Sequence, residues 1–177
     1  KTAVFLLPLL NKIIHNRQQR ALIMTPTREL AQQIQQELQG FGHGLGFRSV
    51  LCIGGVGIGQ QIRDLRHGSP HFLIGTPGRI QDLVERRALN LNGFQNVVLD
   101  EADRMLDMGF IQDMRRILAM LPKPRHSLFF SATCSRQIAE LINTFLTQPV
   151  TISVKVQETA ANIHQDVIRF TDSAHRM

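Results

Sequence analysis

Short apolar runs alternate with amphipathic segments along most of the chain. The runs are apolar at consecutive positions, which favours strands that are buried on both faces of a sheet. We predict strands over residues 21–25, 48–53, 71–75, 96–100, 127–132 and 150–154. The segments between them predict helices, since apolar side chains recur there at helical spacing, as over residues 30–38, 111–121 and 138–145. The alternation predicts an α/β fold with an open, doubly wound, mostly parallel sheet and helices on both faces.

The alternating pattern weakens after residue 154. The segment "KVQETAAN" is typical of a linker, and the following "IHQDVIRF" alternates as one more strand would. We therefore predict one domain over residues 1–154 and a linker or the start of a further domain over residues 155–177.

The charge balance favours a polyanion as partner, although many basic proteins never bind nucleic acid. The 177 residues carry a formal net charge of +6, and arginines greatly outnumber lysines. The planar guanidinium of arginine suits phosphate groups. The 2 cysteines have neither disulfide nor metal spacing, and no apolar run is long enough to cross a bilayer. We therefore expect an intracellular, cytoplasmic protein that does not act on a membrane.

Three acidic residues follow the predicted strand over residues 96–100. Asp100 and Glu101 stand together at its carboxyl end, and Asp103 comes two residues later. A carboxylate in that place can hold a magnesium ion, and a neighbouring glutamate can orient or deprotonate an attacking water. The alternative is that the acids cap the next helix, whose dipole favours negative charge. Three acids so close to a buried strand favour the chemical interpretation.

Lys1 and Thr2 begin a predicted helix and carry little information by themselves. Behind a glycine-rich loop they would be the lysine and threonine of a P-loop, which bind phosphates and magnesium. A P-loop helix combined with an Asp-Glu pair at a strand end is the minimal equipment of a nucleoside triphosphatase.

Two hydroxyl side chains end the predicted strand over residues 127–132. Ser131 and Thr133 could each donate a hydrogen bond to Asp103, which follows a neighbouring strand. Equally, Thr133 or Ser135 could cap the next helix. Both interpretations stay open at this point.

The segments Thr25-Pro26-Thr27-Arg28 and Thr76-Pro77-Gly78-Arg79 repeat one pattern. In each, the first threonine suits the N-cap position and the proline the first helical position. An arginine in the first turn opposes the helix dipole, but it is favourable if an anion binds the free amide groups. Two such sites would hold two phosphates of one polyanion, and Gly54-Gly55 would let its backbone approach closely.

Taken together, these segments resemble the DEAD-box ATP-dependent RNA helicases. The matching segments are "TPTRELA" (25–31), "GG" (54–55), "TPGR" (76–79), "DEAD" (100–103) and "SAT" (131–133). The family fold has two RecA-like α/β domains with ATP bound between them, and this chain resembles the first. The resemblance implies ATP and Mg²⁺ as cofactors. It also implies two partners, RNA and the second RecA-like domain of the same protein.

The resemblance also implies roles for residues near the nucleotide. Lys1 and Thr2 would contact the ATP phosphates and magnesium, and Thr2 and Asp100 would be the metal ligands. Glu101 would be the catalytic base for the attacking water. The resulting function is an ATP-binding domain that couples hydrolysis to RNA binding and local unwinding of a duplex.

Further implied roles concern RNA. Asp103, Ser131 and Thr133 would link the state of ATP to RNA binding and strand separation. The RNA sugar-phosphate backbone would be held with little sequence preference by the other motif residues. These are Pro26, Thr27, Arg28, Gly54, Gly55, Thr76, Pro77, Gly78 and Arg79.

The family's glutamine motif and P-loop glycines would precede Lys1, and the motifs of the second domain would follow the chain. We therefore expect this chain alone to have negligible RNA-stimulated ATPase activity. Two other functions stay open. One is a non-catalytic RNA-binding scaffold, against which the intact Asp100-Glu101 pair argues. The other is a two-metal nuclease using Asp100, Glu101 and Asp103, which lacks further acidic ligands at strand ends.

Overall fold

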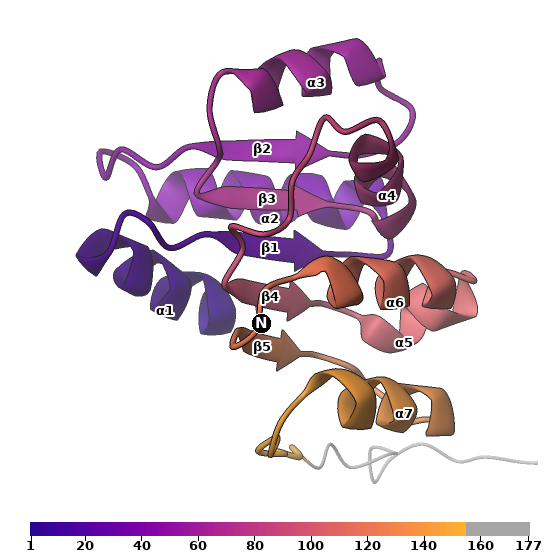
Figure 1. Cartoon of the computed structure of the whole chain (residues 1–177). Helices are drawn as coiled ribbons and strands as arrows, with labels where there is room; N and C mark the ends of the chain where they lie inside the picture. The colour runs from indigo at the N-terminus through magenta and orange to yellow at the C-terminus, as the bar shows by residue number, and fades with distance from the viewer. Residues whose placement is uncertain (155–177) are drawn as a thin grey trace, which may run out of the picture. The chain divides into compact units, whose positions relative to one another are not determined.

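The computed structural model describes residues 1–154, and its helices and strands lie in the compact unit Lys1–Thr147 (Figure 1). The strands are β1 Ala21–Met24, β2 Ser49–Cys52, β3 Phe72–Gly75, β4 Asn96–Leu99 and β5 His126–Phe129. The helices are α1 Thr2–His15, α2 Arg28–Phe41, α3 Ile58–Arg66, α4 Pro77–Glu85, α5 Ala102–Asp107, α6 Ile111–Met120 and α7 Arg136–Phe145.

The strands form a parallel sheet in the order β2-β3-β1-β4-β5. From the central strand β1 the chain passes to the edge strand β2 and returns to β3, which lies beside β1. It then crosses to the other side of β1 and forms β4 and β5, so the sheet is doubly wound as predicted. Five of the six predicted strands are confirmed, and each ends at or before the predicted residue.

The prediction of a strand over residues 150–154 is wrong. Residues 151–154 form no strand, and the side chains of Val150, Ile152 and Val154 are 89%, 84% and 82% exposed. Alternating apolar residues favour a strand only where a neighbouring strand satisfies the backbone groups and a core covers one face. The predicted domain boundary after residue 154 stays a prediction, and the strand-like "IHQDVIRF" lies outside the described residues.

Helices cover both faces of the sheet, and the strands alternate between two cores. Ala21 and Ile23 of β1 pack with α1 and α2, whereas Leu22 and Met24 pack with α3 to α7 on the other face. Each fully buried aliphatic or aromatic side chain contributes about 1.5–3 kcal/mol to folding. The helical stripes predicted from the sequence, such as Ile34 and Leu38 of α2, form these cores.

Among the described residues, the longest helices have 14 residues, and none is long and apolar enough to cross a membrane. Both cysteines are free thiols. Cys52 is buried, and this burial raises the pKa of its thiol to about 12, whereas Cys134 is exposed.

Gly75 ends β3 where that strand lies against β2. A Cβ at this position would overlap the backbone carbonyl of Cys52, which is its partner in the register. A glycine is therefore required here by the close approach of two backbones.

We expect Gly75→Ala to lower the free energy of unfolding by about 3 kcal/mol, because a paired backbone carbonyl cannot move aside without breaking the ladder. Gly40→Ala is the matched control. Gly40 is an exposed helical glycine with open space around its Cα, so that change should raise stability by about 0.5 kcal/mol. Urea unfolding of both variants measures the difference, and equal effects would contradict the packing argument.

Candidate functional site

The candidate residues gather at the carboxyl edge of the sheet. Because all five strands are parallel, the segments that follow them lie along one edge, toward which the arrows in Figure 1 point. The acidic motif follows β4, "SAT" follows β5, and the two Thr-Pro segments follow β1 and β3. The structure thus brings together segments that are far apart in the sequence.

Asp100 is a buried carboxylate that is paired with the first residue of the chain. Its side chain is 3% exposed, and its Oδ1 lies 2.5 Å from Nζ of Lys1. The same Oδ1 accepts a hydrogen bond of 3.0 Å from the backbone N–H of Glu101. A buried charge without such partners would be strongly unfavourable. Oδ2 accepts no hydrogen bond from residues 1–154, so one carboxylate oxygen is left for another ligand.

Glu101 has a left-handed backbone, with φ 53° and ψ 52°. This conformation costs a residue with a side chain roughly 1–2 kcal/mol, and such strain is often found at functional sites. The side chain is 34% exposed, and its Oε2 lies 3.3 Å from Nη1 of Arg104. The turn therefore places a second carboxylate directly beside Asp100 while leaving it accessible to water.

Thr2 lies next to this pair, but its hydroxyl faces another residue. Oγ1 of Thr2 donates a 3.3 Å hydrogen bond to Oε1 of Glu37 on α2. The structure thus brings Lys1 to Asp100, whereas the Thr2 hydroxyl contacts an acid that the sequence analysis did not single out. The role of Thr2 as a metal ligand stays a prediction.

Asp103 joins the acidic motif to the loop after β5. Its Oδ2 accepts hydrogen bonds from the backbone N–H groups of Ala132 (3.1 Å) and Thr133 (3.0 Å) and from the hydroxyl of Thr133 (3.2 Å). The predicted contact between Thr133 and Asp103 is therefore confirmed.

The corresponding prediction for Ser131 is wrong. Its hydroxyl donates to the carbonyl oxygen of Thr133, two residues along the chain, at 2.6 Å, and this local acceptor takes the place of Asp103. Capping of the next helix falls to Ser135, whose Oγ accepts from the N–H of Ile138 at 3.4 Å. Thr133 thus contacts Asp103, and Ser135 caps the next helix.

The contacts of Asp103 change its acidity. Burial alone would raise the pKa of this carboxyl. Hydrogen bonds from the N–H of Arg104, from both groups of Thr133 and from the N–H of Ala132 favour the charged form, and together they lower the pKa below its usual value of 3.8. The carboxylate is therefore fully ionised at neutral pH and holds the loop in place.

The two Thr-Pro segments start their helices differently. Thr76 is the N-cap of α4 and Pro77 its first residue, as predicted. The same prediction for α2 is wrong, because the N-cap is Thr27 and the helix begins at Arg28. Oγ1 of Thr27 accepts from the N–H of Leu30 at 3.2 Å, while the hydroxyl of Thr25 donates to the carbonyl of Thr27 at 3.0 Å.

Both motif arginines converge on the loop after β2. The guanidinium of Arg28 covers Gly54 and Gly55 so closely that a Cβ on Gly55, which has φ +74°, would overlap it. Arg79 donates from Nη1 to the carbonyl of Val56 at 3.2 Å and is only 14% exposed. The two motif arginines therefore differ in exposure. Arg28 is exposed, whereas Arg79 is largely buried behind the loop.

Two residues near the site were missed by the sequence analysis. Glu37 gave no signal, because it belongs to the polar face of α2. Gln61 is buried, and its Nε2 donates to the carbonyl of Ile53 at 2.9 Å, which supports the loop just before Gly54. Its signal was available, since position 61 falls on the apolar face of α3 and a polar residue there needs a partner.

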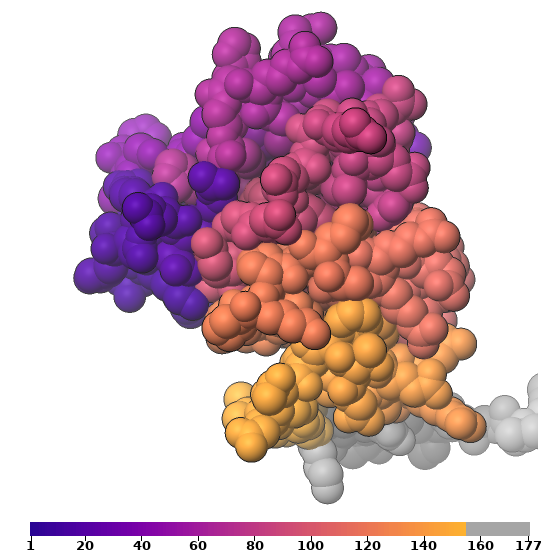
Figure 2. Space-filling model, viewed as in Figure 1, coloured from indigo at the N-terminus to yellow at the C-terminus, as the bar shows by residue number. Residues whose placement is uncertain are grey.

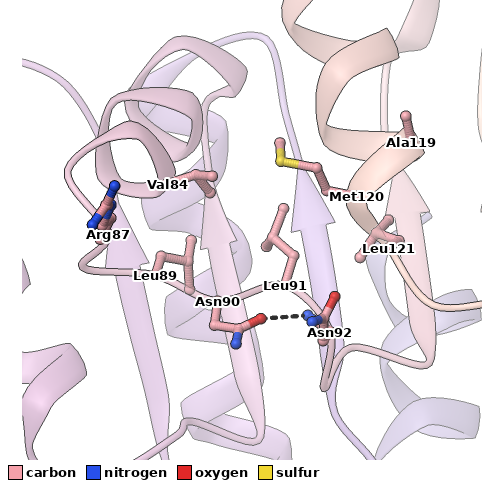
Figure 3. Close-up of a pocket in the computed structure, with 9 residues that line it drawn as sticks. All are labelled: Val84, Arg87, Leu89, Asn90, Leu91, Asn92, Ala119, Met120 and Leu121. Atoms are coloured by element: carbon pink, nitrogen blue, oxygen red, sulfur yellow. Dashed lines mark hydrogen bonds between the residues drawn. The ribbon is translucent and has the colours of Figure 1, made fainter.

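A groove in the described part of the chain lies away from these motifs (Figure 3). It has a volume of about 610 Å³ and is lined by the ends of α4 and α6 and by the loop between α4 and β4. Figure 2 shows that loop and α6 side by side on the face turned to the viewer. Polar and apolar groups share its lining about equally. The backbone N–H of Asn92 donates to Oδ1 of Asn90 at 2.9 Å. None of the candidate residues lines it.

The parallel sheet, its strand order and the acidic residues at its carboxyl edge define an α/β protein of the RecA-like class. More specifically, the chain belongs to the DEAD/DEAH box helicase family, whose model matches residues 1–141.

Curated relatives and solved structures agree with this assignment. RNA helicase CrhR of Synechocystis sp. is 46% identical over 168 residues, which cover 94% of this chain and 34% of that protein. The DEAD-box ATP-dependent RNA helicase CshA of Bacillus cereus is 44% identical over 167 residues, which cover 93% of this chain and 32% of that protein. The chain thus spans about a third of the length of these relatives.

Two solved structures have the same fold. One is a hypothetical ATP-dependent RNA helicase from Sulfolobus tokodaii, with a TM-score of 0.77, 32% identity, and coverage of 84% of this chain and 43% of that one. The other is a DEAD box protein from Methanococcus jannaschii, with a TM-score of 0.76, 40% identity, and coverage of 82% and 39%.

The left-handed backbone of Glu101 leads to a stability prediction. Both Glu101→Gly and Glu101→Ala remove the carboxylate, but only glycine relieves the backbone strain. We expect the glycine variant to be more stable than the alanine variant by about 1 kcal/mol, after allowing for the greater flexibility of unfolded glycine. Urea unfolding at neutral pH measures the difference, and a more stable alanine variant would contradict a strained turn.

The lowered pKa of Asp103 leads to a prediction about pH. A carboxyl with a depressed folded-state pKa stabilises the fold above its unfolded pKa and loses this contribution as the pH falls through the lowered value. Asp103→Asn should therefore cost about 1 kcal/mol at pH 7, a modest figure because the contacts are exposed to water. The gap to wild type should close below pH 3.8 in paired unfolding curves. A gap independent of pH would show that ionisation is not involved.

Proposed function

We propose that this chain is the first, ATP-binding RecA-like domain of an ATP-dependent RNA helicase, which couples ATP hydrolysis to RNA binding and local unwinding. The observation that carries the proposal is the contact of Lys1 with Asp100 beside Glu101, in a motif that Asp103 joins to the "SAT" loop. The family of the chain and its relatives, which are RNA helicases, support it. A second RecA-like domain of the same protein is the expected partner, and an RNA substrate agrees with an intracellular, cytoplasmic location.

The residues at the strand end fit a nucleotide with magnesium. Lys1 is half exposed and supplies a cation for phosphate oxygens, while Asp100 has a free Oδ2 that points to no protein donor within residues 1–154. Asp100 and Thr2 would hold the metal, the latter after its hydroxyl leaves Glu37. Magnesium, when bound, neutralises the negative charge that develops on the phosphate oxygens.

Glu101 is proposed as the catalytic base. Its side chain is partly exposed and lies one residue after Asp100, so a water near the terminal phosphate would be within its reach. The salt bridge to Arg104 orients this carboxylate.

Asp103 is proposed to couple the nucleotide site to RNA. It stands two residues after Glu101 and receives three hydrogen bonds from Ala132 and Thr133. A displacement of the acidic motif would therefore move the loop after β5. Ser131 would act within this loop through its bond to Thr133.

The RNA backbone is proposed to bind along the starts of α2 and α4 and along the loop after β2. Arg28 offers an exposed guanidinium above Gly54 and Gly55, and Arg79 holds the next residue of the same loop. The remaining contacts would come from Pro26, Thr27, Thr76, Pro77 and Gly78. Backbone contacts of this kind give little sequence preference.

Two alternatives are less well supported. A scaffold without chemistry has no use for the strained turn that places Glu101 beside Asp100. A two-metal nuclease would need several free carboxylates, but Oδ2 of Asp103 is occupied, and residues 1–154 hold no group of three or more metal-binding side chains.

The decisive variant is Glu101→Gln in the longer protein that contains both RecA-like domains. Glutamine keeps the shape of the side chain but cannot accept the proton, so RNA-stimulated ATP hydrolysis should fall by roughly 10²–10⁴-fold while ATP binding is retained. Steady-state phosphate release and binding of a fluorescent nucleotide measure the two quantities. Hydrolysis at the wild-type rate would instead support the scaffold.

A further inference from the structure

The net positive charge of the chain is concentrated opposite the motif edge, in helix-to-strand segments that hold seven of the 20 lysines and arginines. The segments that lead from a helix into a strand are "NRQQR" (16–20), "GHGLGFR" (42–48), "HGSPH" (67–71), "RRALNLNGFQ" (86–95) and "LPKPR" (121–125), and none contains Asp or Glu. The segments that follow the strands toward the motifs, such as residues 25–27 and 53–57, contain no Lys or Arg. The charge surplus therefore does not belong mainly to the motif edge.

Cationic residues stand directly before the strands across most of the sheet. Because the first residues of the five strands are in register, the residues before them form a row at the amino edge. In the order of the strands, this row is Arg48, His71, Arg20, Gln95 and Arg125. With neighbouring strands about 4.8 Å apart, it is roughly 20 Å long, which is the length of several nucleotides.

We define the amino-edge patch as Lys12, Arg17, Arg20, Arg48, Lys123 and Arg125. Within residues 1–154, none of the six forms an ion pair with a carboxylate. These cations lie close enough to two histidines to lower their pKa. Burial lowers the pKa of His71, and Arg17, Arg20 and Arg48 lower it further, while burial and Lys12 lower that of His126.

Folding explains only part of the patch. Arg48 and Arg125 donate to backbone carbonyl groups, and Lys12 donates to Oδ1 of Asn96 at 2.8 Å. A cation at the end of α1 is also favoured by the helix dipole. Arg17 donates to the carbonyl of Leu45 at 2.8 Å and lies over the ring of Phe47. Even so, Arg17 and Lys123 are exposed, and neither pairs with a carboxylate in the described part of the chain.

A groove lies beside Lys12 of this patch, along the end of α1 and the segment that leads to β1. It has a volume of about 410 Å³, and polar side chains line it. These are Asn11, Lys12, His15, Asn16 and Gln19. A cation beside several amides suits a phosphate group, and the carbon stems of these side chains, which make up more of the groove's surface than their polar atoms, suit a ribose or a base.

We propose that the amino-edge patch and its groove form a second contact surface for the RNA sugar-phosphate backbone, at the opposite end of the strands from the motif residues. The choice of RNA rests on the proposed function, but the surface uses none of the motif residues. An RNA too short to span both edges would then bind each edge separately.

The test compares two pairs of substitutions in the 177-residue chain. Arg17→Gln with Lys123→Gln removes two exposed charges from the patch. Arg116→Gln with Arg136→Gln removes two exposed charges from α6 and α7, so the net charge of the control is the same. Binding of a fluorescent oligouridylate of about ten nucleotides is followed by anisotropy over a range of salt concentrations, and native mass spectrometry gives the stoichiometry.

We expect the patch variant to bind RNA more weakly, by about fivefold at 0.1 M salt for each side chain that held a phosphate, and the log-affinity against log-salt slope to flatten by about 0.7 for each such phosphate. Its stoichiometry should fall from two RNA molecules to one, and the control should match wild type. Crosslinks from 4-thiouridine RNA should map to residues 11–19 or 123–126. Equal weakening of the control, or a single RNA on wild type, would overturn the proposal.

Two further measurements separate this proposal from the proposed function. Arg28→Ala with Arg79→Ala should remove the other RNA molecule and leave the crosslinks at the amino edge. If it abolishes all binding, the amino-edge patch is wrong and the motif surface stands. If only the patch variant loses RNA, the motif surface is wrong and the patch stands. Displacement of RNA from the patch by polyglutamate at equal charge concentration would assign the surface to acidic proteins instead.

Discussion

The parallel direction of the five strands is the constraint on which the arrangement of this protein depends. Parallel strands require helical crossovers, so every strand is left at one edge of the sheet and entered at the other. The carboxyl edge thereby collects the acidic motif, the "SAT" loop and the starts of two helices. The amino edge collects the segments without carboxylates. One topological rule thus separates the candidate chemistry from the segments that hold seven of the 20 lysines and arginines and no carboxylate.

Burial then decides how the candidate residues behave. Asp100 is buried with its charge, and such a group must have a partner, which Lys1 provides. Asp103 is more exposed, so its contacts contribute less to stability and can be broken more easily. The strained backbone of Glu101 lies between the two. Within four positions, the firmly held Asp100 is followed by the strained Glu101 and by Asp103, whose contacts are more easily broken. This order suits a site that must respond to its ligand.

Much of the site could be predicted from the sequence, because strand ends and helix starts are local features. Asp100, Thr133 and the start of α4 lie where the pattern placed them. The misses have identifiable causes. The N-cap of α2 is Thr27 and not Thr25, because either threonine can cap a helix and the path of the chain selects between them. The hydroxyl of Ser131 donates to a local acceptor, the carbonyl of Thr133, instead of to Asp103. The segment over residues 150–154 has strand-like composition but no strand beside it.

The sequence by itself determined the alternation of strands and helices, the doubly wound class and the motif positions, because these depend on periodicity and on turn chemistry within a few residues. Only the tertiary structure decided which distant groups meet. The contact of Lys1 with Asp100, the burial of Arg79 behind Val56 and the alignment of Arg48, Arg20 and Arg125 before their strands all join separate segments. Such contacts depend on strand order and register, which no local pattern encodes.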